Sequence, residues 1–320
     1  MLTRRHIRVK ILQNLYAADV TGDHDLQKAE SKLIKSVDSL YDLFIYQLSF
    51  IQEIVDFALY KTEERRNKKL PTPEDLNPNM RFVENAFLEK LINCRGLRRE
   101  IDRLKISWAT YPEIIRNVYN TFTESDAYKA YMTAEVNTFN SDRKIGETLY
   151  FDYILGSESF EMFFEDLGAG WSDDLPIAAF FVQKTFNNIK STRPFDQLPT
   201  LFKNFDEAGA SDDRRFMIDL QRQTMIHDKE YYELIAGHTR NWDFERIPHI
   251  DVIILKMALA ELQYFPTIPI KVTLNEYIDL SKIFSTPKSS LFINGILDKL
   301  IAELGDAGKI RKIGRGLIDK

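Results

Sequence analysis

The chain has 320 residues, of which 44% are hydrophobic, so it can bury a core in one large domain or two modest ones. Its formal net charge of −5 excludes a protein that binds nucleic acid over its whole surface, and any such contact has to be a local basic patch. A single cysteine, Cys94, excludes an intramolecular disulfide and a zinc site built from cysteines.

The first predicted element is a basic helix that begins behind Thr3. Arg4, Arg5 and Arg8 stand in its first two turns, where cations oppose the helix dipole and repel one another. Folding gains nothing from this arrangement, whereas a phosphate would bind to it, and the ring of Tyr16 could stack on an unpaired base. The alternative is a basic surface helix without a ligand.

Neither a targeting segment nor a membrane span is expected. Lys10, Gln13 and Asn14 interrupt the apolar stretch of the N-terminus, so no signal peptide is predicted there. No window has the uninterrupted apolar length that a membrane span needs. We therefore expect a cytoplasmic protein without membrane contact.

A long helical hairpin is predicted next. Apolar residues at steps of three and four predict one helix from Glu30 to Arg66, and three prolines between residues 71 and 78 then break the chain. A second helix is expected from Val83 to Leu104, with Cys94 on its buried side, and the pair would form an antiparallel hairpin. The basic clusters at 65–69 and 95–103 are either solvated helix faces or further contacts to a nucleic acid, and the sequence leaves this open.

Shorter helices and an irregular connector at 193–211 are predicted before a compact C-terminal group of helices. Helix 250–264 is apolar nearly all round and should lie at the centre of a bundle, followed by helices at 271–284 and after Thr286. The last helix should bury Phe292, Ile296 and Leu300. The basic tail 305–320 is expected to be flexible.

The sequence contains no convincing catalytic constellation. His227 and Glu230 stand one helical turn apart, but no third ligand lies near them in the sequence. We therefore expect no enzymatic activity, no metal and no cofactor.

Three segments of the C-terminal third resemble the NusB family of antitermination factors. They are ILKMALAEL (254–262), IPIKVTLNEYIDLSKIF (268–284) and FINGILDKL (292–300), and the opening RRHIRVKILQNLY (4–16) is similar to the family's arginine-rich first helix. The resemblance covers roughly residues 1–20 and 212–304. It leaves 21–211 as a helical insertion of unknown role.

The resemblance implies an all-α helical bundle of the NusB type that carries the inserted hairpin and further helices. It implies a transcription antitermination factor that binds boxA-type leader RNA together with ribosomal protein NusE. That complex would act on the RNA polymerase elongation complex with other Nus factors to promote ribosomal RNA synthesis. Carried over by position, the RNA contacts would be Arg4, Arg5, Arg8, Gln13, Tyr16 and Lys271, and the partner face would include Asp251 and Glu276.

Two other functions remain possible from the sequence. One is a helical protein-interaction scaffold without RNA binding. The other is the RNA-binding part of a ribosomal RNA methyltransferase system. This second alternative is disfavoured because the chain shows no alternating pattern of strands and helices, and because Cys94 does not follow a proline.

Overall fold

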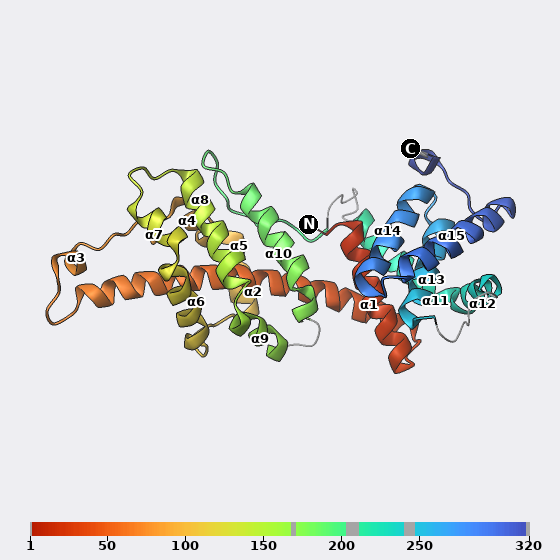
Figure 1. The fold of residues 1–320 in the computed structure, drawn as a ribbon, viewed down its shortest axis with the longest axis horizontal. Coiled ribbons are helices and arrows are strands. Elements are labelled where there is room, and N and C mark those ends of the chain that lie inside the picture. Colours follow the sequence, from red (N-terminus) through yellow and green to blue (C-terminus); the bar gives the residue numbers. More distant parts are fainter. Residues whose placement is uncertain (1, 168–170, 203–210, 240–246, 318–320) are drawn as a thin grey trace. The chain divides into compact units, whose positions relative to one another are not determined.

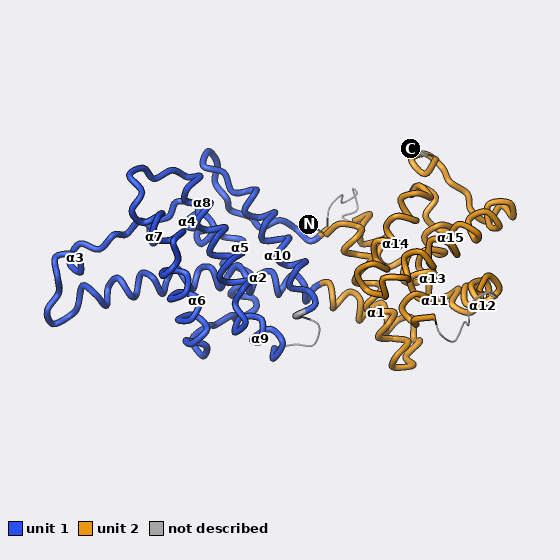
Figure 2. The backbone as a smooth tube through the Cα atoms, in the orientation of Figure 1, with its two compact units in different colours: residues 1, 38–201 blue, residues 2–37, 202–320 orange. Residues whose placement is uncertain are grey.

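The computed structural model describes residues 2–167, 171–202, 211–239 and 247–317, and the regular elements of these ranges are helices (Figure 1). The predicted all-α fold class is confirmed. The chain forms two compact units (Figure 2). Unit 1 contains residues 38–201, and unit 2 contains residues 2–37 and 202–320. The division thus lies at 37/38 and 201/202, whereas the sequence places the insertion between 21 and 211.

Unit 1 is built on the longer part of α2 (Leu26–Arg66), whose apolar stripe from Val37 to Ala58 is buried. The single long helix expected from Glu30 to Arg66 is therefore confirmed. The other helices of the unit are α3 (Pro73–Leu76), α4 (Ala86–Ile92), α5 (Arg95–Leu104), α6 (Pro112–Glu124), α7 (Asp126–Thr133), α8 (Phe139–Thr148), a π-helical turn (Leu149–Ile154), α9 (Glu158–Leu167) and α10 (Trp171–Asn188).

The predicted hairpin is wrong in its second half, because α4 and α5 replace one long helix. The Asn85 side chain accepts hydrogen bonds from the backbone N–H groups of Phe87 and Leu88 and so begins α4. Cys94, which is buried, then adopts an extended conformation that separates the two helices. Side-chain capping and this extended residue override the helical period of the apolar residues.

Unit 2 is a bundle around α13 (His249–Tyr264), which contacts α1, α11, α12, α14 and α15. Every residue from Val252 to Leu262 is buried, so the central position expected from its apolar sequence is confirmed. The other helices of the unit are α1 (Arg4–Thr21), the start of α2, α11 (Asp212–Ile226), α12 (Asp228–His238), α14 (Ile270–Phe284) and α15 (Ser289–Asp306). The last of them begins at Ser289, after the turn that contains Thr286.

The described part of the C-terminal tail forms hydrogen bonds with an earlier turn of the chain. The backbone N–H of Ile313 donates to the Pro266 carbonyl at 3.0 Å, and Lys312 Nζ donates to the Phe265 carbonyl at 3.1 Å. A short 3₁₀ helix, Gly314–Leu317, follows. The tail was expected to be flexible, but these contacts tie it to the turn between α13 and α14.

Within the described residues, α2 is the one helix with a length and composition that would also allow a membrane crossing, whereas no such segment was expected from the sequence. In its most apolar stretch 61% of the residues are buried inside the protein. This burial is what a core helix of unit 1 requires, and by itself the helix is weak evidence for a membrane span.

Candidate nucleic-acid interface

The candidate interface starts with the geometry of the first helix. Thr3 adopts an extended conformation and its side chain accepts from the backbone N–H of His6, while the His6 ring accepts from the backbone N–H of Thr3. This reciprocal cap fixes where α1 begins. It places Arg4, Arg5 and Arg8 in the first two turns, as predicted.

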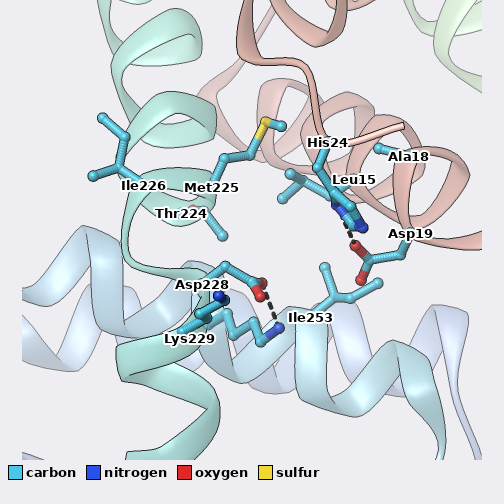
Figure 3. A pocket seen from close by; sticks show the side chains of 11 residues that line it. Leu15, Ala18, Asp19, His24, Thr224, Met225, Ile226, Asp228, Lys229 and Ile253 are labelled. Atoms are coloured by element: carbon cyan, nitrogen blue, oxygen red, sulfur yellow. Dashed lines mark hydrogen bonds and ion pairs between the residues drawn. The ribbon is translucent and has the colours of Figure 1, made fainter. Parts of the chain in front are cut away.

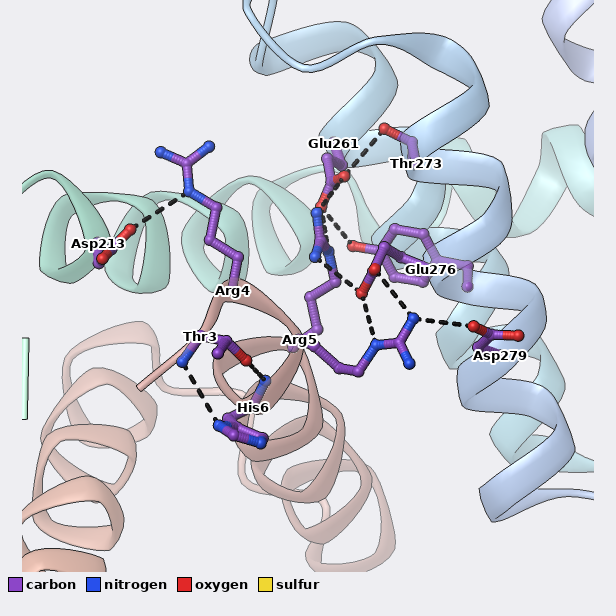
Figure 4. Close-up of polar contacts among 11 residues, drawn as sticks. Thr3, Arg4, Arg5, His6, Asp213, Glu261, Thr273, Glu276 and Asp279 are labelled. Atoms are coloured by element: carbon purple, nitrogen blue, oxygen red, sulfur yellow. Dashed lines mark hydrogen bonds and ion pairs between the residues drawn. The ribbon is translucent and has the colours of Figure 1, made fainter. Parts of the chain in front are cut away.

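The three arginines have carboxylate partners, and Figure 4 labels Arg4 and Arg5 beside theirs. Arg4 Nε lies 3.3 Å from Asp213, and Arg5 binds both Glu276 and Asp279 at 3.0 and 2.8 Å. The sequence-based premise that folding gains nothing from these cations is therefore wrong. The premise considered only the repulsion among cations within the first turns of α1. In the folded protein, acids of α11 and α14 lie beside these cations, and their attraction offsets the repulsion.

Arg8 is the most buried member of the group. Its guanidinium forms a two-pronged pair with Glu261 of α13, with both N–O distances at 2.7 Å and side-chain exposures of 3% and 0%. The hydroxyls of Thr273 and Tyr277 donate to the same carboxylate at 2.9 and 3.1 Å. Burial alone would lower the pKa of Arg8, but the charge of Glu261, its hydrogen bond to Arg8 and the smaller effects of Tyr277 and Glu276 together outweigh burial and raise the pKa. Arg8 in this position holds α1 to α13 and α14 and exposes only a small edge of its side chain at the surface.

The sequence did contain a signal for this pair, although the prediction missed it. Glu261 stands in the otherwise apolar segment ILKMALAEL at the centre of the bundle. A carboxylate on a helix that is buried all round needs a cationic partner. Arg8, on another helix that is mainly buried, is that partner.

An open groove of about 750 Å³ lies beside the start of α1. It is lined by Thr3, Arg4, Arg5, Arg8, Thr267, Ile268, Pro269, Val272, Glu276 and Arg315. The side chains of Arg4 and Arg5 remain nearly half exposed, despite their acidic partners. Arg315 comes from the C-terminal tail and was not among the predicted site residues, because nothing local in the sequence indicates that the tail docks here.

The other predicted RNA contacts differ in their surroundings. Tyr16 is 43% exposed and lies on the same stripe of α1 as Arg5 and Gln13. The Gln13 side chain is half-buried, and its Oε1 atom has no hydrogen-bond partner in the described part of the chain. Lys271 is exposed in the first turn of α14, beside the groove residue Val272. The structure thus leaves Tyr16 and Lys271 accessible.

The two predicted partner-contact residues are not free surface groups. Asp251 is 1% exposed at the start of α13, and one of its carboxylate oxygens is buried without a partner among the described residues. Glu276 accepts from Arg5 and also from Arg8 at 3.2 Å. A partner could therefore reach the Asp251 carboxylate only by rearranging the residues around it, whereas Glu276 lines the groove but is already paired with arginines.

A second cavity of unit 2, of about 380 Å³, lies among α1, α11, α12 and α13 (Figure 3). Asp19 lines this cavity, and its carboxylate lies 3.8 Å from His24 and 3.2 Å from His249. Lys256 pairs with Asp228 across from it. Within the described ranges no cluster of histidine, cysteine and acidic side chains has the arrangement of a metal site.

The His227–Glu230 motif forms a hydrogen-bonded surface cluster. His227 Nδ1 lies 3.0 Å from Glu230, and its Nε2 lies 2.6 Å from the hydroxyl of Tyr264. The hydrogen bond from His227 lowers the pKa of the Glu230 carboxyl. Both imidazole nitrogens are thus already engaged within the protein.

Comparison with known proteins adds a family match. The profile described as the NusB family matches residues 180–302, which begins earlier than the predicted 212 and does not include α1. A protein of Salinibacter ruber is 42% identical over 105 residues, which are 33% of this chain and 66% of that protein. One of Geobacter sulfurreducens is 42% identical over 102 residues, 32% of this chain and 74% of that protein.

A third relative, from Chloroherpeton thalassium, is 45% identical over 85 residues, 27% of this chain and 40% of that protein. All three relatives are named transcription antitermination protein NusB, a name that denotes no enzyme. The chain covers less than two thirds of the Salinibacter and Chloroherpeton proteins.

Proposed function

This chain belongs to the NusB family, and we propose on that basis that it is a cytoplasmic transcription antitermination factor. It would bind boxA-type leader RNA together with ribosomal protein NusE. The resulting complex would join the RNA polymerase elongation complex with other Nus factors during ribosomal RNA synthesis. No catalytic group, metal or cofactor takes part in this proposal.

The observation that carries the proposal is the groove at the start of α1. Arg4 bonds to Asp213 through Nε alone, and Arg5 uses Nε and Nη2 for its acids, so both keep guanidinium N–H groups for a further acceptor. A phosphate oxygen accepts from such groups strongly. A backbone phosphate in the groove would then place the following bases along α1 toward Gln13 and Tyr16.

Arg8 has a different role in this proposal from the one expected at first. Its guanidinium is buried against Glu261, so it positions α1 and the groove and does not contact RNA. Lys271 remains a candidate for a peripheral phosphate contact. Asp251 and Glu276 remain candidates for the protein-partner face. A partner would have to displace the residues that bury Asp251 and the arginines that are paired with Glu276.

The proposal is tested by a gel shift of the full chain with the organism's own ribosomal RNA leader, with and without purified NusE. We expect binding of the boxA-type RNA that NusE strengthens, and weaker binding of a scrambled RNA of equal length. If neither RNA binds with or without NusE, the chain is a protein-interaction scaffold and the proposal is wrong.

Replacing Tyr16 by leucine is expected to weaken RNA binding by roughly 1–3 kcal/mol, because one stacked base loses its aromatic platform. The dependence of binding on salt should hardly change, since no phosphate contact is removed. Affinity is measured by filter binding over a series of salt concentrations.

Tyr232→Leu is the matched control, because Tyr232 has a similar exposure of 46% but lies on α12 and not on the stripe of α1 that carries Arg5, Gln13 and Tyr16. Equal losses for the two variants would mean that Tyr16 does not stack on a base.

A further inference from the structure

The C-terminal tail reaches the groove through a close backbone approach. Gly316 is buried against the turn between α13 and α14, where a Cβ atom built on it would lie 2.0 Å from the Pro266 carbonyl oxygen. No side chain fits at that distance, so only glycine allows this contact. Together with the hydrogen bonds of Ile313 and Lys312 to the same turn, it fixes the path of residues 312–316.

This path brings Arg315 into the lining of the groove, together with Arg4, Arg5 and Arg8. Arg315 is exposed, and it forms no ion pair or hydrogen bond with any residue of the described chain. It therefore differs from the α1 arginines, each of which has at least one carboxylate partner.

The charge balance of the site makes this difference important. The guanidinium groups of Arg4, Arg5 and Arg8 are matched by the carboxylates of four acids, namely Asp213, Glu261, Glu276 and Asp279. The three arginines of α1 thus supply N–H donors for hydrogen bonds but little net positive charge. A polyanion gains most from cations that are not already neutralised, and among the described arginines that line the groove Arg315 is the one without a carboxylate partner in the described chain.

We propose that the docked tail completes the RNA site, with Arg315 binding a backbone phosphate of the RNA whose neighbouring phosphate contacts Arg4 and Arg5. This inference rests on the proposed RNA-binding function and extends it to a segment outside the family match, which ends at residue 302. Gly316 acts as a positioning residue, because it lets the tail approach closely enough to present Arg315.

Two variants test the proposal in the full chain, with a single-stranded leader RNA that carries the boxA-type element as the probe. Arg315→Gln removes the charge, and Gly316→Ala keeps every charge but displaces the tail from Pro266. We expect each to weaken RNA binding about tenfold, as for the loss of a charged hydrogen bond. The slope of log affinity against log salt should fall by about 0.7 for the lost phosphate contact, and Arg315→Lys should recover part of the affinity.

Two controls are matched to these variants. Arg311→Gln removes a tail arginine that bonds to the Gly308 carbonyl and does not line the groove. Gly305→Ala adds a methyl group on α15 where no atom lies within 4 Å. Both should bind RNA as the unchanged protein does, and NusE binding in the absence of RNA should be equal for all variants.

Several outcomes would overturn the inference. Unchanged RNA affinity of both Arg315→Gln and Gly316→Ala would show that the tail is not part of the site. An equal loss for Arg311→Gln would show a general effect of tail charge, and a loss of NusE binding without RNA would show that the groove receives an acidic protein surface. If the unchanged protein binds no RNA, the proposed function fails first and the inference fails with it.

Discussion

Replacing Arg8 by alanine is expected to destabilise unit 2 by about 3–5 kcal/mol, which is a large fraction of the stability of an ordinary domain. The substitution leaves the Glu261 carboxylate, which is 0% exposed, without its cation, and among the described residues the hydroxyls of Thr273 and Tyr277 are the donors that remain. Desolvation of an unpaired charge in a helical core is far more costly than the loss of an exposed ion pair.

Amide hydrogen exchange of α13 and α14 is the appropriate measurement, because the chain has two units and one global transition cannot be assumed. Arg215→Ala is the control, since the Arg215–Asp212 pair is exposed and should contribute less than about 1 kcal/mol. Equal exchange rates in the Arg8 variant and the unchanged protein would mean that Glu261 is hydrated or protonated and that the pair does not hold the bundle.

A double variant, Arg8→Met with Glu261→Gln, separates the effect of the charge from that of the packing. It removes both charges and keeps an amide oxygen that can accept from Thr273 and Tyr277. We expect it to be more stable than Arg8→Ala alone, because no unpaired charge remains in the core. A double variant as unstable as the single one would point to side-chain packing as the main contribution of Arg8.

Replacing Leu300 by alanine is expected to cost about 2–5 kcal/mol, as for other fully buried leucines. Leu300 is 0% exposed on α15, which packs against α12, α13 and α14. The loss combines the transfer free energy of the removed atoms with the cavity that they leave. It is measured by denaturant unfolding together with hydrogen exchange of α15.

Leu291→Ala is the control on the same helix. Leu291 is 79% exposed, so its replacement removes no core contact. Its effect should stay within about 0.5 kcal/mol. If Leu300→Ala were equally harmless, α15 would be peripheral to the core of unit 2.

These expectations change how RNA-binding variants have to be chosen. A charge reversal at Arg8 would weaken RNA binding through loss of the fold, and the result would say nothing about phosphate contacts. Arg4, Arg5 and Arg315 are better sites, because their side chains are exposed or half-exposed and their loss leaves the buried Glu261 paired.

The sequence by itself determined the helical fold class, the long buried helix α2 and the central position of α13. These features depend on local periodicity, since one apolar stripe indicates a helix with one buried face and apolar residues all round indicate a buried helix. The capped start of α1 behind Thr3 was predictable for the same reason, because a cap involves residues only a few positions apart.

Only the tertiary structure decided what the arginines of α1 do. Their partners lie more than 200 positions away in the chain, so a pattern that is unfavourable within one helix becomes a set of ion pairs when α11, α13 and α14 pack against it. The same holds for the tail, where a glycine contact with Pro266 brings Arg315 to the groove. Pairing over such separations depends on how helices pack, and the local period of a sequence carries no information about it.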